Sequence, residues 1–206
     1  MSSHQHQTHP TVAAPPDACV VPPSASGDRQ GRVDRLLADP RVQREVRGVV
    51  GRVQGVLAGR AVVEPVCGDG WWTAHLAQAA QAVTALTDDP AALRRAAARR
   101  LPPNRVRLVQ AAPEDLPRLG GAFDGGFGAF LCAGPSAFCR TDVLTLLHRR
   151  LGPGAAVVLV DAREPEAGSA AMAEDDLRAR VRETAPDARA LKVDVGERLW
   201  CLSYTL

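Results

Sequence analysis

Residues 62–73 read VVEPVCGDGWWT, and this stretch decides how the rest of the chain is interpreted. An apolar run at residues 61–63 ends at Glu64, passes through Gly68-Asp69-Gly70, and continues into residues 71–76, which include neither glycine nor proline. This order predicts a strand, a tight turn and a helix. Glycine suits the turn because the backbone must reverse with φ values that a side chain disfavours.

The predicted turn also indicates a type of ligand. The first N–H groups of a helix have no partner within the helix and carry the positive end of its dipole. Such a helix start favours a carboxylate, a phosphate or ribose oxygens, and a ligand can lie directly on bare glycine backbone. We therefore expect a small polar or anionic ligand at Gly68 and Gly70.

The bulk composition limits the class of protein. The chain has 206 residues, 46% of them hydrophobic and 23% charged, which indicates one soluble globular domain. The 25 basic and 23 acidic residues give a net charge of +2, too small to indicate binding to nucleic acid or to a membrane surface. No apolar run approaches the roughly 20 residues that span a bilayer, and a signal-peptide pattern is absent. We expect a cytoplasmic protein.

Cysteine usage agrees with that compartment. Five cysteines are scattered along the chain without a Cys-x-x-Cys pair, which indicates free thiols under reducing conditions. They are Cys19, Cys67, Cys132, Cys139 and Cys201.

Three segments are expected along the chain. Residues 1–27 are rich in Pro, Ser and Ala with almost no bulky side chains, so they are predicted to be a disordered tail. The three histidines of this tail lack a fourth ligand, and no metal site is predicted. Residues 28–60 are predicted to form an N-terminal helical segment that begins at Asp39-Pro40 and serves either as a lid or as a packing helix. Residues 61–206 form the main domain.

Strands and helices are expected to alternate through the main domain. An α/β fold with helices on both faces of a mostly parallel sheet is predicted. The last two strands are separated by a very short turn at Gly196, so they must be antiparallel. After the first strand, further strands are expected at residues 83–86, 106–110, 123–131, 155–160, 190–195 and 198–206. Helices are expected at 71–80, 89–101, 141–151 and 169–184, and a short helix or turn at 113–119. The arginines of the helix at 89–101, Arg94, Arg95, Arg99 and Arg100, are interpreted as a solvated face.

Several of these pieces resemble the class I S-adenosylmethionine (SAM) dependent methyltransferases. In that family a strand ending in an acid runs into a glycine turn such as GCGTG, and Glu64, Cys67, Gly68 and Gly70 match it. FDGGFGAFL at residues 123–131 is similar to the family's FDxVxxxxxL strand, and residues 147–161 resemble its LxRxLxPGGxxxxxD segment. The resemblance implies a Rossmann-like fold with a seven-stranded, mostly parallel sheet that ends in an antiparallel hairpin. It also implies SAM as the cofactor.

The resemblance further implies which residues hold the cofactor. The family ends its second strand in an acid that binds the ribose hydroxyls, and this chain has Thr87 followed by Asp88. Many members place an Asp after the third strand for the adenine, and this chain has Ala112 with Asp115 three residues later, so Asp115 or a backbone carbonyl is the alternative contact. The implied cofactor-binding set is Glu64, Cys67, Gly68, Asp69, Gly70, Thr87, Asp88, Ala112, Pro113 and Phe130.

Candidate catalytic residues are few. Methyl transfer is an in-line displacement that needs positioning, and it needs a base only when the acceptor is a poor nucleophile. His75 lies one turn past the glycines, and Cys132 and Ser136 follow the predicted fourth strand, where reacting groups gather in such sheets. His75 and Cys132 also have structural interpretations, as a structural or surface histidine and as a buried thiol.

Four functions are consistent with the sequence. The first is a SAM-dependent methyltransferase acting on a small molecule, for example a natural-product intermediate. The second is a protein of the same fold that catalyses a cyclisation or rearrangement, and the third is a non-catalytic binding subunit. The fourth is a nicotinamide dinucleotide site, because Gly68-x-Gly70 is followed about 20 residues later by Asp88, although Thr73 occupies the place of the third glycine.

Overall fold

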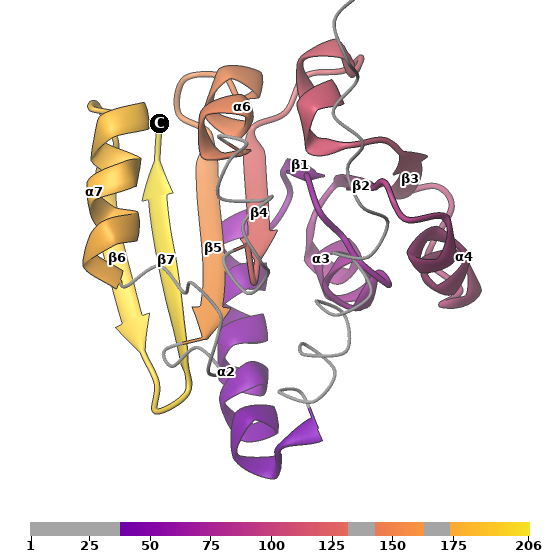
Figure 1. Cartoon of the computed structure of the whole chain (residues 1–206), viewed down its shortest axis with the longest axis horizontal. Coiled ribbons are helices and arrows are strands. Elements are labelled where there is room, and N and C mark those ends of the chain that lie inside the picture. Colours follow the sequence, from indigo (N-terminus) through magenta and orange to yellow (C-terminus); the bar gives the residue numbers. More distant parts are fainter. Residues whose placement is uncertain (1–37, 132–142, 163–173) are drawn as a thin grey trace, which may run out of the picture.

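A single seven-stranded sheet forms the centre of the protein in the computed structural model, which describes residues 38–131, 143–162 and 174–206 (Figure 1). The strand order is β3-β2-β1-β4-β5-β7-β6. The first five strands are parallel, and β7 runs antiparallel to both of its neighbours, β5 and β6. The predicted mostly parallel sheet with a closing antiparallel hairpin is confirmed. The strands are β1 (Ala61–Glu64), β2 (Ala82–Thr87), β3 (Val106–Gln110), β4 (Gly125–Ala129), β5 (Ala156–Ala162), β6 (Arg189–Val195) and β7 (Leu199–Thr205).

Helices cover both faces of the sheet. On one face α2 (Pro40–Leu57) and α3 (Trp71–Ala79) share a buried apolar cluster with the strands. The other face is covered by the 3₁₀ helix η1 (Pro113–Arg118), α6 (Val143–Arg150) and α7 (Glu174–Thr184). Helix α4 (Pro90–Ala98) packs against β2 and β3. None of the helices in the described ranges is long and apolar enough to cross a membrane.

Successive strand residues belong to opposite faces of the sheet. Val62 and Val158 lie in the cluster with α2 and α3, whereas their neighbours Val63 and Val157 lie in the cluster with α6 and α7. All four are fully buried. Because side chains alternate along a strand, covering both faces requires apolar residues at consecutive positions. A ligand is therefore expected at an edge where the strands end.

Two predicted elements are shorter in the structure. The fourth strand was expected at residues 123–131, but β4 covers only Gly125–Ala129. It ends there because Phe130 has a φ of +52°, which an extended strand does not accommodate. Helix α4 similarly ends at Ala98, before the left-handed Arg100 (φ +54°). The expected helix cap Thr141 and the first residues of the helix at 169–184 lie outside the described residues.

Helix α2 is a full part of the core. The Asp39 side chain caps it by accepting from the amide of Arg41 (2.8 Å), as the Asp-Pro start predicted. Its buried residues recur every three or four positions and join the same cluster as the sheet. They are Val42, Val46, Val49, Val53 and Leu57. Of the two roles left open for residues 28–60, packing is the one that these contacts support.

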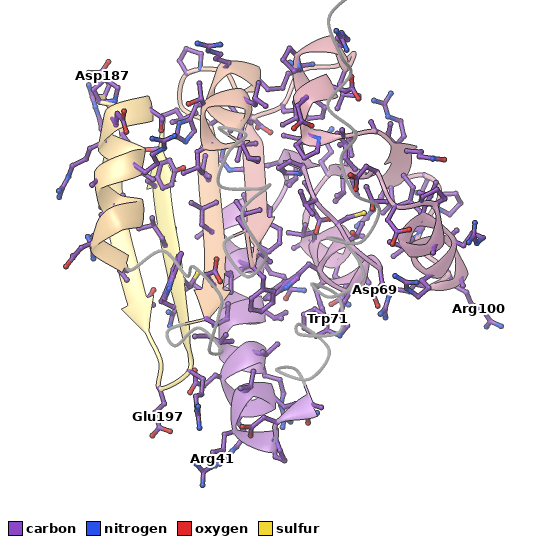
Figure 2. All side chains as sticks on the ribbon, viewed as in Figure 1. Arg41, Asp69, Trp71, Arg100, Asp187 and Glu197 are labelled. Carbon is purple, nitrogen blue, oxygen red and sulfur yellow. The ribbon has the colours of Figure 1, made fainter. Side chains whose placement is uncertain are left out.

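A carboxylate of α2 also holds the C-terminal hairpin. Glu45 accepts hydrogen bonds from the backbone N–H groups of Glu197, Arg198 and Leu199 at 3.0–3.1 Å. Arg41, at the start of α2, and Glu197, at the tip of the hairpin, lie at the same end of the molecule (Figure 2). The amides of Glu197 and Arg198 lie in the turn between β6 and β7, and Leu199 begins β7, so Glu45 holds the connection between these two strands.

We predict that Glu45→Ala lowers the free energy of unfolding by about 1–3 kcal/mol, because three turn amides lose a charged acceptor. Glu45→Gln, which keeps one acceptor oxygen, should cost less. Urea denaturation measures both variants. The exposed Glu183 is a suitable control, because Glu183→Ala should change the stability by less than about 0.5 kcal/mol. Equal stability of Glu45→Ala and the unaltered protein would contradict the prediction.

Candidate functional site

The candidate site lies at the carboxyl edge of the parallel strands. The chain connects β1 to β2 and β3 on one side, then returns to place β4 and β5 on the other side of β1. This reversal leaves a crevice at the end of β1, where ligands of open α/β sheets bind. In Figure 2, Asp69 and Trp71 lie towards the same end of the molecule as Glu197, and Asp187 lies at the opposite end.

The turn after β1 has the backbone geometry that its glycines predicted. Gly68 and Gly70 have φ values of +53° and +78°. The amide of Cys67 donates to the carbonyl of Leu86 (2.7 Å), which ties the turn to β2. In the described part of the chain, the amides of Gly68 and Asp69 donate no hydrogen bond. Together with the start of α3, these amides form a site suited to a carboxylate or phosphate.

Gly70 has a second role that the sequence did not indicate. A Cβ on this residue would lie 2.9 Å from Cβ and 3.2 Å from Cα of Ala96 in α4. The missing side chain therefore allows α4 to pack directly against the turn. Gly70 is needed for helix packing as well as for its left-handed backbone.

Glu64 ends β1 as a buried carboxyl group. Its side chain is 1% exposed, and the Thr73 hydroxyl of α3 donates to Oε2 at 2.6 Å. Burial raises the pKa of Glu64 to about 8. At neutral pH the carboxyl group is therefore mostly protonated and carries little negative charge.

Cys67 is a structural residue of the turn. The thiol is buried, and its Sγ lies 3.6 Å from the carbonyl oxygen of Gly68. Burial, reinforced by the nearby Glu64, raises the pKa of this thiol well above its usual range. A thiol in this state is a poor nucleophile, so Cys67 contributes packing and backbone geometry.

At the end of β2, the exposed carboxylate belongs to Asp88. Thr87 is buried, and its hydroxyl accepts from the amide of Asp89 at 3.3 Å. Asp89 caps α4 by accepting from the amide of Ala91 (2.7 Å). Asp88 is exposed and has no hydrogen bond or ion pair with the described residues. Of these residues, Asp88 is the one whose carboxylate is available to a ligand.

The segment after β3 is already engaged in its own contacts. The amide of Ala112 donates to Asp115 Oδ2 (3.2 Å), and Asp115 Oδ1 accepts from Arg118 (2.8 Å). Both oxygens of Asp115 thus have partners, which disfavours the expected alternative contact between Asp115 and a ligand. Pro113 is buried at the start of η1. Phe130 follows β4, which lies on the opposite side of β1 from β3. It is 2% exposed, and its amide donates to the carbonyl oxygen of Val160 (2.7 Å).

Of the two tryptophans after the turn, Trp72 belongs to the core and Trp71 is only half-buried. Trp72 is buried, and its ring centroid lies 5.1 Å from that of Phe127. Trp71 is half-buried, and its ring lies 4.3 Å from the ring of His75. Burial, and then the charge of Arg99, lowers the pKa of His75, so its imidazole is neutral at pH 7. The other two catalytic candidates, Cys132 and Ser136, lie outside the described residues.

The structure adds contacts that sequence reasoning missed. Arg99, interpreted as part of a solvated face, donates Nε to the carbonyl oxygen of Asp69 (2.7 Å) and forms an ion pair with the Asp69 carboxylate. No sequence signal links residues 30 positions apart in this way. Asp161 is buried at the end of β5 and accepts from the amide of Ala162 (2.8 Å). No group of three potential metal ligands occurs within residues 38–131, 143–162 and 174–206.

Comparison with known proteins assigns a family pattern to the centre of the chain. Residues 62–154 match a family model described as "Methyltransferase domain". No curated protein is detectably similar to the chain in sequence.

Solved structures share the fold. A complex of DhpI with S-adenosylhomocysteine (SAH) is 20% identical, with a TM-score of 0.64 over 88% of this chain and 94% of that one. The N-methyltransferase NodS from Bradyrhizobium japonicum WM9 is 19% identical (TM-score 0.62, 82% and 98% covered). Magnesium protoporphyrin IX methyltransferase from Synechocystis PCC 6803 with bound SAM is 18% identical (TM-score 0.63, 87% and 92% covered).

We predict that Glu64 makes the stability of the protein fall as pH rises. In the unfolded chain the carboxyl group ionises near pH 4.5, whereas the folded protein keeps the proton up to about pH 8. The stabilisation that Glu64 provides is therefore fully present below pH 4.5. As pH rises towards 8 it is lost, and the free energy of unfolding falls by about 1.4 kcal/mol per pH unit. Urea denaturation at pH 5 to 8 should show a shallower loss for Glu64→Gln. The exposed Glu183→Gln should leave the slope unchanged, and an equal slope in Glu64→Gln would contradict the prediction.

We also predict that Gly70→Ala costs more stability than Gly59→Ala. Both glycines have positive φ (+78° and +69°), but a Cβ on Gly59 meets nothing within 4 Å. Gly59→Ala therefore measures the backbone strain alone, about 1–2 kcal/mol, and Gly70→Ala adds the clash with Ala96. In an Ala96→Gly background, Gly70→Ala should cost less than in the unaltered protein. Equal costs in the two backgrounds would show that Ala96 does not limit the turn.

Proposed function

We propose that this chain is a class I SAM-dependent methyltransferase that transfers the methyl group of SAM to a small-molecule acceptor, because residues 62–154 match a methyltransferase domain model. The enzyme class follows from the family and the fold. The acceptor class rests on the net charge of +2, which is too small to indicate nucleic-acid binding. A natural-product intermediate remains our expectation for the acceptor, and the cytoplasm for the location.

The observation that carries the proposal is the turn between β1 and α3. It presents two amides without acceptors in the described part of the chain, at Gly68 and Asp69, beside the start of a helix. These donors suit the carboxylate of an amino acid, which is one end of SAM. Glu64, buried at the base of the turn, is mostly neutral at pH 7 and adds no negative charge that would repel this carboxylate.

The remaining residues fit the nucleoside end of the cofactor. The free carboxylate of Asp88 at the end of β2 can accept hydrogen bonds from two ribose hydroxyls, which the buried Thr87 hydroxyl cannot. We assign the adenine side to the backbone of Ala112 and Pro113, which follow β3, and to Phe130, which follows β4. When bound, SAM supplies a methyl group activated by its positively charged sulfur.

The protein's own contribution is positioning. Transfer of a methyl group from sulfur requires the acceptor, the methyl and the sulfur to lie in line, which a rigid turn on a buried sheet can provide. His75 has a neutral imidazole and is the described residue that we assign as a candidate base. Cys132 and Ser136 stay candidates for acceptor contacts.

Isothermal titration calorimetry with SAM and SAH tests the cofactor assignment directly. Binding of either ligand with a dissociation constant in the micromolar range would support it. The absence of heat at millimolar SAH would overturn the proposed function. Screening of small acceptors by SAH release then follows with the same protein.

We predict that Asp88→Asn weakens SAH binding by about tenfold, since a neutral amide replaces the charged acceptor for the ribose. Asp187→Asn is the matched control, because Asp187 is an exposed aspartate at the opposite end of the molecule (Figure 2). Its affinity for SAH should equal that of the unaltered protein. Unchanged binding in Asp88→Asn would remove Asp88 from the site.

A further inference from the structure

Arg99, the C-cap residue of α4, contacts the glycine turn between β1 and α3. The Nε atom of Arg99 donates to the carbonyl oxygen of Asp69 at 2.7 Å, and its guanidinium also pairs with the Asp69 carboxylate. Asp69 lies between the left-handed Gly68 and Gly70. One side chain thus contacts both the backbone and the side chain of the central residue of the turn, in the two-point geometry that favours arginine over lysine.

The same end of α4 supports the turn sterically. Ala96 leaves no room for a Cβ on Gly70, and the Arg99 Cδ atom would lie 3.7 Å from such a Cβ. The side chains of Arg99 and Asp69 are 33% and 17% exposed, so the pair is partly shielded from water. The turn is therefore held between β2, through the Cys67 amide, and α4, through Arg99.

The position of the Asp69 carboxylate creates an electrostatic problem for a ligand. Its Oδ1 accepts from the amide of Trp71 (3.2 Å) and so occupies the positive start of α3. An unpaired negative charge there would repel a ligand carboxylate on the neighbouring amides of Gly68 and Asp69. The guanidinium of Arg99 offsets this charge.

We propose that Arg99 is a positioning residue of the cofactor site, which holds the glycine turn in its ligand-binding shape and neutralises Asp69 so that the carboxylate of SAM can bind. The inference rests on the proposed function. It adds a residue from outside the glycine turn and outside the implied cofactor-binding set. Arg99 acts through Asp69 and is not assigned a contact with the ligand.

Calorimetry with SAH and a matched pair of variants tests this role. Arg99→Ala should raise the dissociation constant by about tenfold. Arg94→Ala also removes one positive charge, but Arg94 is exposed and has no hydrogen bond or ion pair with the described residues. The affinity of Arg94→Ala for SAH should therefore equal that of the unaltered protein. Arg99→Lys, which keeps the charge but loses the two-point geometry, should fall between Arg99→Ala and the unaltered protein.

A double variant separates charge from simple loss of structure. In Asp69→Asn/Arg99→Ala no charge remains to repel the ligand, so this protein should bind SAH more tightly than Arg99→Ala alone. A general weakening of the fold would give the opposite order, because the double variant loses more contacts. A double variant that binds no better than Arg99→Ala would overturn the neutralising role.

Hydrogen exchange in the ligand-free protein provides a readout without cofactor. The amides of Cys67 and Gly70 are hydrogen-bonded to Leu86 O (2.7 Å) and Cys67 O (2.9 Å). They should exchange about fivefold faster or more in Arg99→Ala, and at the original rate in Arg94→Ala. Unchanged exchange together with unchanged SAH affinity in Arg99→Ala would overturn the inference and leave the proposed function intact. If the unaltered protein bound no SAH, the proposed function would fail and the inference with it.

Discussion

The reversal of the chain between the end of β1 and the start of α3 is the constraint on which the site depends. Two backbone conformations with positive φ allow it, and a buried hydrogen bond from Thr73 to Glu64 joins the helix back to the strand. The turn is hydrogen-bonded to β2 through the Cys67 amide and packs against Ala96 of α4. This packing preorganises the backbone of the glycine turn for a ligand.

Charge at the site is controlled by burial and pairing. Glu64 is buried and keeps its proton at neutral pH, while Asp69 forms an ion pair with Arg99. Asp88 is left as an exposed carboxylate at the next strand end. Three acids within one edge of the sheet thus present different hydrogen-bonding groups to a ligand: a neutral carboxyl, a compensated carboxylate and a free one. A cofactor that carries both charges and hydroxyls matches such a set.

The two ends of the described chain also contribute to this edge. Helix α2 belongs to the same apolar cluster as the sheet, and Glu45 joins it to the turn between β6 and β7. The N-terminal helix and the C-terminal hairpin are therefore tied together beside the strand ends. Removing α2 would expose a buried face of the sheet, and removing the hairpin would expose the edge of β5, so both elements stabilise the fold.

The sequence by itself determined the order of strands and helices, the antiparallel hairpin and the position of the glycine turn. These properties follow from local backbone preference and from apolar residues at consecutive positions, such as Val62 and Val63. Only the tertiary structure decided that Asp88 is exposed while Thr87 is buried, that α4 packs on Gly70, and that Arg99 pairs with Asp69. Contacts between residues 26 or 30 positions apart depend on how the crossovers place the end of α4 against the turn between β1 and α3. A pattern of neighbouring residues carries no information about that placement.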